Sequence, residues 1–366
     1  MGIFIVLFAY LLLVRLFSTN RSNERSRRRT AIFCGLGLWV VLALRSPFCG
    51  HDLLGGEMEG YSYYNMFHMM ASTSWSSLFD SFYDKSSIES GWLLYCKIII
   101  LFTDYFQIFL AITAALQIIM IGYVIYKLSD DIVISFITYF AFGLYVMSFS
   151  GLRQSMAYAM TFLASYFLLK KKNAPFFLLV IMAYFIHRSA IVFILMFFLG
   201  KIKLTRQRLN LAVVVSLLTI PFFSLLSSYI TAFVFPEKYA QHVVEESGAI
   251  GLFLLYLFLF FLSQKIPTGN QKMDFIREMI LLAVLGQSLG IFDAGYSTRI
   301  AFYFSIFFTL YFPILINHYS DFKPKREITI SVSVGLFAFF CWYVRGGYLN
   351  VVPYYFFWDN GLLYVK

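Results

Sequence analysis

The sequence predicts an all-α, polytopic integral membrane protein, and three observations support this fold class. Hydrophobic residues make up 60% of the 366 residues and charged residues only 13%, whereas about a quarter of the residues in a soluble domain are charged. The hydrophobic residues form successive runs, many of them close to the roughly 20 residues that a helix needs to cross a bilayer. A helix also satisfies its own backbone hydrogen bonds where water is absent. We therefore expect one polytopic domain over residues 1–366.

Basic clusters between the apolar runs orient the chain. Lysine and arginine concentrate in the short loops on the cytoplasmic side of a membrane protein. These loops account for the net charge of +10, so the sequence does not predict a nucleic-acid partner. The clusters occupy residues 15–29, 170–172, 201–208, 265–277 and 323–326.

The apolar runs predict roughly 11–12 transmembrane helices. Two of them, 175–186 and 190–199, are short, but basic clusters lie at both ends of the pair. A single helix would place one cluster on the wrong side, so we expect a hairpin with His187 and Arg188 at its tip. In chain order the runs cover residues 3–17, 31–44, 106–128, 132–147, 152–169, 175–186, 190–199, 209–226, 250–262, 275–291, 300–316 and 328–344.

Two outer loops and one short apolar run complete the organisation. Residues 45–90 are too polar to span a bilayer, and their aromatic and methionine-rich part, YSYYNMFHMM, is expected to form an amphipathic interfacial helix. Residues 91–102 are apolar but give only about half a span at ~1.5 Å per residue, so they predict a half-helix. The second outer loop covers residues 228–248.

Five arginines lie where an apolar run meets the outer side: Arg45, Arg153, Arg188, Arg299 and Arg345. An arginine within the bilayer costs about 2.5–3.5 kcal/mol on the insertion scale, so such residues usually have a function. Their number runs against the positive-inside trend and indicates an anionic ligand. Phosphate is the best match, because the planar guanidinium can bind it through two parallel hydrogen bonds.

Structural explanations remain open for three of these arginines. Arg45 and Arg345 adjoin polar loops and can extend to lipid headgroups or pair with a loop carboxylate. Arg299 follows Asp293 closely enough to form a structural ion pair.

The strongest candidates lie in the core region 149–190. Arg153 and Gln154 begin one apolar run, and Arg188 follows His187 at the expected hairpin tip. Both groups are at the ends away from the intervening lysines, so they can converge on one outer site. A neutral imidazole can accept a proton from a hydroxyl group, although a single histidine more often braces a helix.

Carboxylates of the first outer loop are candidate partners of that site. Asp52 and the pair Glu57 and Glu59 lie in the loop, and Glu89 lies behind them at the mouth of the half-helix. Taken singly, each is also explained by ordinary solvation. The four cysteines form no CxxC pair, so the sequence predicts neither a disulfide framework nor a zinc site, and it predicts no other metal or cofactor.

At these residues the chain resembles the EpsG family, a branch of the Wzy-type polysaccharide polymerases. The matching pattern is an R…G-x-D outer loop from Arg45 to Asp52, an RQ-x-x-A helix start within GLRQSMAYA, and an FH-x-S-A hairpin within FIHRSA. The match is specific over about residues 30–190. It is looser in the loop, where GHDLLGGEMEGYSYY contains additional glycines and glutamates.

The resemblance implies a metal-independent glycosyltransferase of the bacterial cytoplasmic (inner) membrane. Such an enzyme polymerises undecaprenyl-diphosphate-linked oligosaccharide repeat units into O-antigen, capsule or exopolysaccharide on the periplasmic face. Its partners would be these substrates and membrane lipid, and a separate chain-length regulator protein stays open. We expect His187, Asp52 and Arg153 to be catalytic. The expected diphosphate-binding residues are Arg45, Arg153, Gln154, Arg188, Arg299 and Arg345.

The competing functional class is a membrane transporter, such as a flippase for the same lipid-linked oligosaccharide. A transporter predicts cationic residues near the middle of the spans, around a central cavity. The middles of the apolar runs are nearly free of charge, which favours a one-sided site. A membrane sugar O-acyltransferase is less well supported, because the matching arginine-to-histidine motif near the amino terminus is missing.

Overall fold

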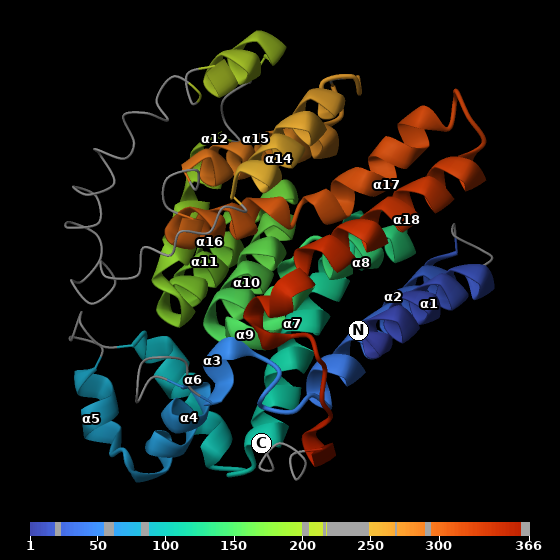
Figure 1. Cartoon of the computed structure of the whole chain (residues 1–366). Helices are drawn as coiled ribbons and strands as arrows, with labels where there is room; N and C mark the ends of the chain where they lie inside the picture. The colour runs from blue at the N-terminus through green and yellow to red at the C-terminus, as the bar shows by residue number, and fades with distance from the viewer. Residues whose placement is uncertain are drawn as a thin grey trace.

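The computed structural model describes residues 1–18, 23–54, 62–81, 88–199, 205–214, 217, 249–267, 269–289 and 294–359. The predicted outer loop 228–248 lies outside these residues. Within them the regular structure is helical, apart from a single antiparallel bridge between Arg45 and Phe356. The long helices lie side by side in one bundle, with the short helices α3–α6 gathered at one end (Figure 1). The all-α fold class is thus confirmed for the described part of the chain.

The amino-terminal helices α1 and α2 form an adjacent pair (Figure 1). The second begins earlier than expected, because its first turns lie within the arginine cluster. Its start is capped by the Asn23 side chain, which accepts a hydrogen bond from the Arg25 N–H at 2.9 Å, and Glu24 favours the positive end of the helix dipole. The bounds are α1 (Gly2–Phe17) and α2 (Glu24–Ala43).

The first outer loop contains short helices, one of which is amphipathic as predicted. In α4 one face is buried, whereas Tyr64 and Met69 are exposed. The Lys97 ammonium donates to the carbonyl oxygens of Met70 and Thr73, both at 2.8 Å. This satisfies carbonyl groups at the carboxyl end of α4 and ties that helix to α6. The loop helices are α3 (His51–Leu54), α4 (Tyr63–Ser72) and α5 (Trp75–Asp80).

Helices α6 (Ser90–Ile100) and α7 (Phe106–Leu128) match the expected half-helix and full span. Large apolar side chains spaced three or four residues apart are exposed along α7, as expected of a face in contact with lipid. Among the described helices, α7 alone is long and apolar enough to cross a membrane by itself, and up to three spans result if each of two bent helix pairs is one span. The exposed stripe consists of Ile108, Ile112, Leu116, Ile119 and Tyr123.

The run 132–147, expected as one straight span, is broken into α8 (Ile132–Ala141) and α9 (Leu144–Ser150), which are bent by 53°. Gly143 causes the break because it has a φ of 79°, a conformation that side chains with a Cβ rarely adopt. A Cβ there would also lie 2.6 Å from the Tyr343 ring. The expectation of a continuous helix is therefore corrected.

The core region forms the predicted helix and hairpin. Helix α10 has the expected bounds, and the segment after it turns back at His187. The Phe177 ring near the start of α11 lies 4.8 Å from the Phe197 ring in α12, so the two arms are antiparallel and the hairpin is confirmed. The bounds are α10 (Leu152–Leu169), α11 (Asn173–Ile186), η1 (Arg188–Ile194) and α12 (Leu195–Leu199).

The run 300–316 is also broken, with α16 and α17 bent by 43°. Pro313 lies inside α17 and cannot donate a hydrogen bond to the Thr309 carbonyl. That carbonyl accepts instead from the Ser135 hydroxyl at 2.6 Å. The carboxyl-terminal elements are α14 (Ala249–Ser263), α15 (Gln271–Leu289), α16 (Ala294–Ser305), α17 (Phe308–Tyr319), α18 (Lys325–Tyr343) and η3 (Arg345–Asn350).

Ion pairs gather two of the predicted cytoplasmic clusters at the turn between α7 and α8. Arg15 pairs with Asp131 at 2.9 Å, and Lys272 pairs with Asp130 at 2.5 Å. Arg27 donates to a backbone carbonyl of the same turn at 2.8 Å. The first and fourth basic clusters therefore lie at the same end of the bundle, as the positive-inside rule requires of residues on one side.

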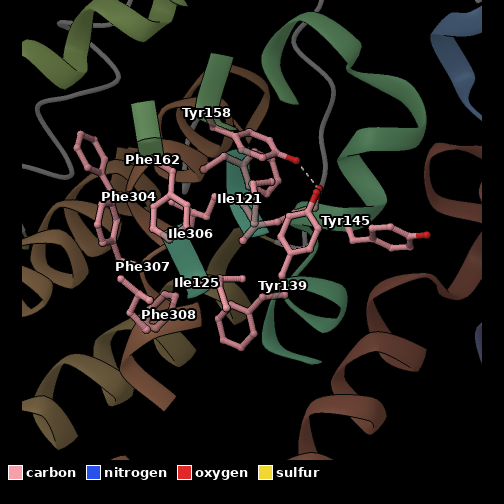
Figure 2. Close-up of a cluster of buried hydrophobic side chains, with 14 of the residues drawn as sticks. Ile121, Ile125, Tyr139, Tyr145, Tyr158, Phe162, Phe304, Ile306, Phe307 and Phe308 are labelled. Carbon is pink, nitrogen blue, oxygen red and sulfur yellow. Dashed lines mark hydrogen bonds between the residues drawn. The ribbon is translucent and has the colours of Figure 1, made fainter. Parts of the chain in front are cut away.

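Buried aromatic side chains form the core where α7, α8, α9, α10, α16 and α17 meet (Figure 2). The Phe162 and Phe307 rings pack edge to face with centroids 5.2 Å apart, which joins α10 to the break between α16 and α17. Tyr158 donates to the Leu144 carbonyl at 2.5 Å, next to the break between α8 and α9. These contacts fix the two bent helix pairs against α10.

Glycine 91 allows α6 to approach the hairpin closely. A Cβ at Gly91 would lie 2.6 Å from the Phe185 carbonyl oxygen and 2.7 Å from the Phe185 Cβ. Both distances are shorter than atoms can approach, so only glycine permits this separation of α6 and α11. The close contact brings the start of α6 next to the end of α11.

We expect the Gly91→Ala variant to be less stable by about 1–3 kcal/mol, because overpacking forces the two backbones apart. Thermal unfolding of the purified protein would measure the change. Gly335→Ala is the matched control, since a Cβ at Gly335 meets nothing within 4 Å and alanine favours a helix interior. Equal melting temperatures for Gly91→Ala and the unmodified protein would show that α6 and α11 do not need this contact.

Candidate functional site

A buried carboxylate lies at the centre of the site. Glu89 directly precedes α6 and contacts donors from two other segments. One carboxylate oxygen, Oε2, accepts a hydrogen bond from the Arg153 guanidinium in the first turn of α10. The other, Oε1, lies 3.0 Å from His187 Nδ1 and accepts from the Arg188 backbone N–H at 3.2 Å. One carboxylate thus joins α6, α10 and the tip of the hairpin.

Charge and burial fix the protonation states of Glu89 and His187. Both residues lie at helix ends, outside the helices themselves. Burial alone would raise the pKa of the Glu89 carboxyl, but the His187 hydrogen bond and the Arg153 charge outweigh it and hold this pKa well below its usual range. Burial lowers the pKa of His187 from its ordinary 6.5, and the charges of Arg153 and Arg299 add to this effect against the opposing effect of Glu89. The site therefore pairs an ionised carboxylate with a neutral imidazole at pH 7.

The outer loop covers one flank of this centre. The Arg153 backbone N–H donates to the Tyr63 hydroxyl at 3.3 Å, and the Arg153 guanidinium lies 5.8 Å from the centre of the Tyr63 ring, which is a cation–π distance. Asp52 accepts a hydrogen bond from the Ser150 hydroxyl at 2.9 Å. The Asp52 carboxylate therefore lies beside the turn that leads into α10.

A glycine explains how the loop reaches that turn. Gly50 has a φ of 142°, and a Cβ there would lie 2.1 Å from the Phe149 carbonyl oxygen. Any larger residue would push α3 away from the end of α9. The G-x-D pattern thus has a physical basis, because the glycine permits the approach that places Asp52 against Ser150.

Helix α16 closes the other flank. The Gln154 side-chain amide donates to the Arg299 backbone carbonyl at 2.8 Å, and the Ser189 and Tyr303 hydroxyl groups lie 3.0 Å apart. Arg299 is exposed, and its charge acts on His187. The structure thus brings six of the predicted residues together: Asp52, Arg153, Gln154, His187, Arg188 and Arg299.

Two of the predicted arginines have other surroundings. Arg45 is 1% exposed, donates to the Leu42 and Ser148 carbonyls at 2.8 and 3.2 Å, and lies over the Phe149 ring. Arg345 is exposed in η3, with its guanidinium 5.1 Å from the centre of the Trp342 ring. In the described contacts the guanidinium of Arg45 binds backbone carbonyl groups and that of Arg345 packs on an aromatic ring, so their part in diphosphate binding stays a prediction.

Sequence reasoning underestimated Glu89. It was one of several loop acids, and only its place directly before an apolar half-helix distinguished it. Tyr303 was not singled out by any signal, because the chain contains 26 tyrosines. Its contact with Ser189 joins two segments that are far apart in sequence.

The assembled groups suit a reaction between an anionic substrate and a second substrate with a reactive hydroxyl group. The Arg153 guanidinium pairs with Glu89, and the charge of Arg299 also acts on His187, so positive charge from α10 and from α16 lies near the imidazole. Arginine binds phosphate oxygens through charge-assisted hydrogen bonds. A neutral imidazole in the same cluster can accept a proton. The arrangement therefore combines anion binding with general-base chemistry.

Comparisons with curated proteins and with solved structures found no match. The sequence model of the EpsG family matches residues 28–356. This region contains every residue of the cluster and nearly all of the helical bundle. The chain therefore belongs to the EpsG family, and this membership implies a polysaccharide polymerase-type function.

Proposed function

We propose that the protein is a glycosyltransferase that joins undecaprenyl-diphosphate-linked oligosaccharide repeat units into O-antigen, capsule or exopolysaccharide. The observation that carries this proposal is the meeting of Arg153 and His187 at one buried carboxylate, with Arg299 close enough for its charge to act on His187. A polymerase of lipid-linked sugars must bind a diphosphate and remove a proton from a sugar hydroxyl. The cluster contains groups for both tasks.

The basic clusters support a site on the periplasmic face of the cytoplasmic membrane. The lysines that follow α10 belong on the cytoplasmic side by the positive-inside rule. Helix α10 has 18 residues, so Arg153 at its start lies about 25 Å from these lysines at ~1.5 Å per residue. This separation is close to the ~30 Å thickness of the hydrocarbon layer. The cluster then opens near the outer boundary of the membrane.

The diphosphate is the leaving group of the proposed reaction. The acceptor hydroxyl oxygen forms a bond to the anomeric carbon of the donor sugar, and the bond from that carbon to the phosphate oxygen breaks. The departing diphosphate takes the electron pair, and charge develops on its oxygens. Arg153, Arg188 and Arg299 provide positive charge for this group, and such preorganised charge is usually the largest contribution to catalysis.

His187 is the better of the two predicted bases. Its imidazole is neutral at pH 7 and contacts Glu89 only through Nδ1. Asp52, the alternative, accepts a hydrogen bond from the Ser150 hydroxyl beside the turn into α10 and makes no direct contact with Glu89 among the described contacts. In this scheme the proton of the acceptor hydroxyl moves to His187 as the glycosidic bond forms.

We expect Arg153→Ala to lower the polymerisation rate by about 10²–10³-fold, as does removal of one stabilising donor elsewhere. Arg153→Lys retains the charge but not the planar fork, so it should restore part of the activity. The measurement is the length distribution of the polymer on a gel, in a deletion strain that expresses each variant. Arg326→Ala, an exposed arginine at the start of α18, is the matched control. Normal long-chain polymer from Arg153→Ala at equal expression would exclude the role of this arginine.

Deletion of the gene should leave single repeat units attached to their final carrier, because units still cross the membrane but are not joined. A flippase would give a different result, with lipid-linked units trapped on the cytoplasmic side. Protease-free spheroplasts treated with a membrane-impermeant glycan-modifying enzyme distinguish the two locations. Trapped internal units would contradict the polymerase assignment.

A further inference from the structure

Glu89 differs from an ordinary helix-capping residue. It occupies the N-cap position of α6, but its side chain makes no capping hydrogen bond to that helix. Both carboxylate oxygens are directed to other segments, to Arg153 and to His187 with the Arg188 backbone N–H. The carboxylate is only 10% exposed. A buried charge must be paired, and this one is paired with other segments and not with its own helix. The contacts of Glu89 therefore indicate a role other than capping α6.

The contact with His187 selects one tautomer of the imidazole. An ionised carboxylate can only accept hydrogen bonds, so a neutral His187 carries its proton on Nδ1, which points to Glu89 at 3.0 Å. The lone pair is then on Nε2. In the described part of the chain no hydrogen bond to His187 Nε2 is seen, and the side chain as a whole is 16% exposed.

The ion pair at the opposite end of the bundle provides a comparison. Arg15 and Asp131 form a buried pair in which both carboxylate oxygens bind the same guanidinium nitrogen, at 2.9 and 3.0 Å. Asp131 also caps α8, because its side chain accepts a hydrogen bond from the Ile134 N–H at 3.3 Å. The two carboxylate oxygens of Glu89 instead contact the guanidinium of Arg153 and the imidazole of His187. These are the two side chains that we expect to contact substrate.

We propose that Glu89 is the positioning residue of the site, holding His187 with Nε2 toward the acceptor hydroxyl and Arg153 toward the donor diphosphate. This role rests on the proposed polymerase function. As the acceptor oxygen bonds to the anomeric carbon and the diphosphate leaves with its electron pair, the hydroxyl proton passes to Nε2. The imidazolium that results is stabilised by the adjacent Glu89 carboxylate, which stays ionised.

The charged groups that face His187 determine the direction of the test. Glu89 from α6 favours the imidazolium, whereas Arg153 from α10 and Arg299 from α16 oppose it. Removing the Glu89 charge while keeping an acceptor atom, as in Glu89→Gln, should lower the pKa of His187 further. If the Glu89 carboxylate did not contact His187 in the folded protein, this pKa would stay unchanged relative to an equally folded control.

Histidine NMR of the full-length protein in lipid nanodiscs measures this directly. The chain has five histidines, and a His187→Gln spectrum identifies the signals of His187. In the unmodified protein we expect neutral His187 to carry its proton on Nδ1. In Glu89→Gln its titration should move to lower pH, whereas Glu327→Gln, an exposed acid in α18, should leave it in place.

Two results would overturn the positioning role. One is a proton on Nε2 of neutral His187 in the unmodified protein, which needs no variant to fold. The other is an unchanged or raised His187 titration in a folded Glu89→Gln protein. If that variant does not fold, Glu89→Asp keeps the charge on a shorter side chain. In this variant the pKa of His187 should stay above the pKa that a buried imidazole has with no carboxylate beside it. A His187 pKa as low as that of such an unpaired imidazole would also overturn the role.

A polymerisation assay separates this inference from the proposed function. Membranes that contain native lipid-linked repeat units should form polymer about 10–100-fold more slowly with Glu89→Gln, and the acid limb of the rate profile should move to lower pH with the His187 titration. If the NMR results hold but no membrane preparation forms polymer, the polymerase function fails and the Glu89–His187 geometry stands. If polymer forms and the acid limb does not move, the positioning role fails.

Discussion

The arrangement of the site depends on one electrostatic constraint, the pairing of a buried carboxylate. An ionised group in an apolar interior is strongly unfavourable unless it is paired and hydrogen-bonded. Glu89 obtains its partners from α10 and from the hairpin tip, so these segments must meet at the start of α6. Removing any of these partners would leave the buried Glu89 charge incompletely paired in a low-dielectric environment. The cost of such an unpaired charge keeps the three segments together.

Backbone shape makes this meeting possible. Gly91 lets α6 approach Phe185, and Gly50 lets the outer loop approach Phe149. The bend at Gly143 separates α9 from α8, and the chain then reverses into α10. The glycines take no part in the chemistry, but the backbone approaches that they permit determine where Glu89 and Arg153 can be placed.

Local sequence signals predicted where the helices lie better than they predicted whether each helix is unbroken. The lysines after α10 and the His187 tip gave the helix and hairpin correctly, because charge and length are local properties. The breaks at Gly143 and before Pro313 were missed, since an apolar run looks continuous whatever its backbone does. The partnership between Glu89 and Arg153 could not be predicted from the sequence, because it depends on packing between segments that a single sequence does not pair. The burial of Arg45 on backbone carbonyl groups could not be predicted either, because it also depends on contacts between distant segments.

The hydrogen bond from residue 188 to Glu89 comes from the backbone and not from the side chain. Every amino acid except proline has this N–H group. The tip of the hairpin thus holds the Glu89 carboxylate through its main chain at position 188, the x of the FH-x-S-A pattern. A replacement there would change the charge presented to an incoming saccharide diphosphate while this backbone hydrogen bond to the carboxylate could still form.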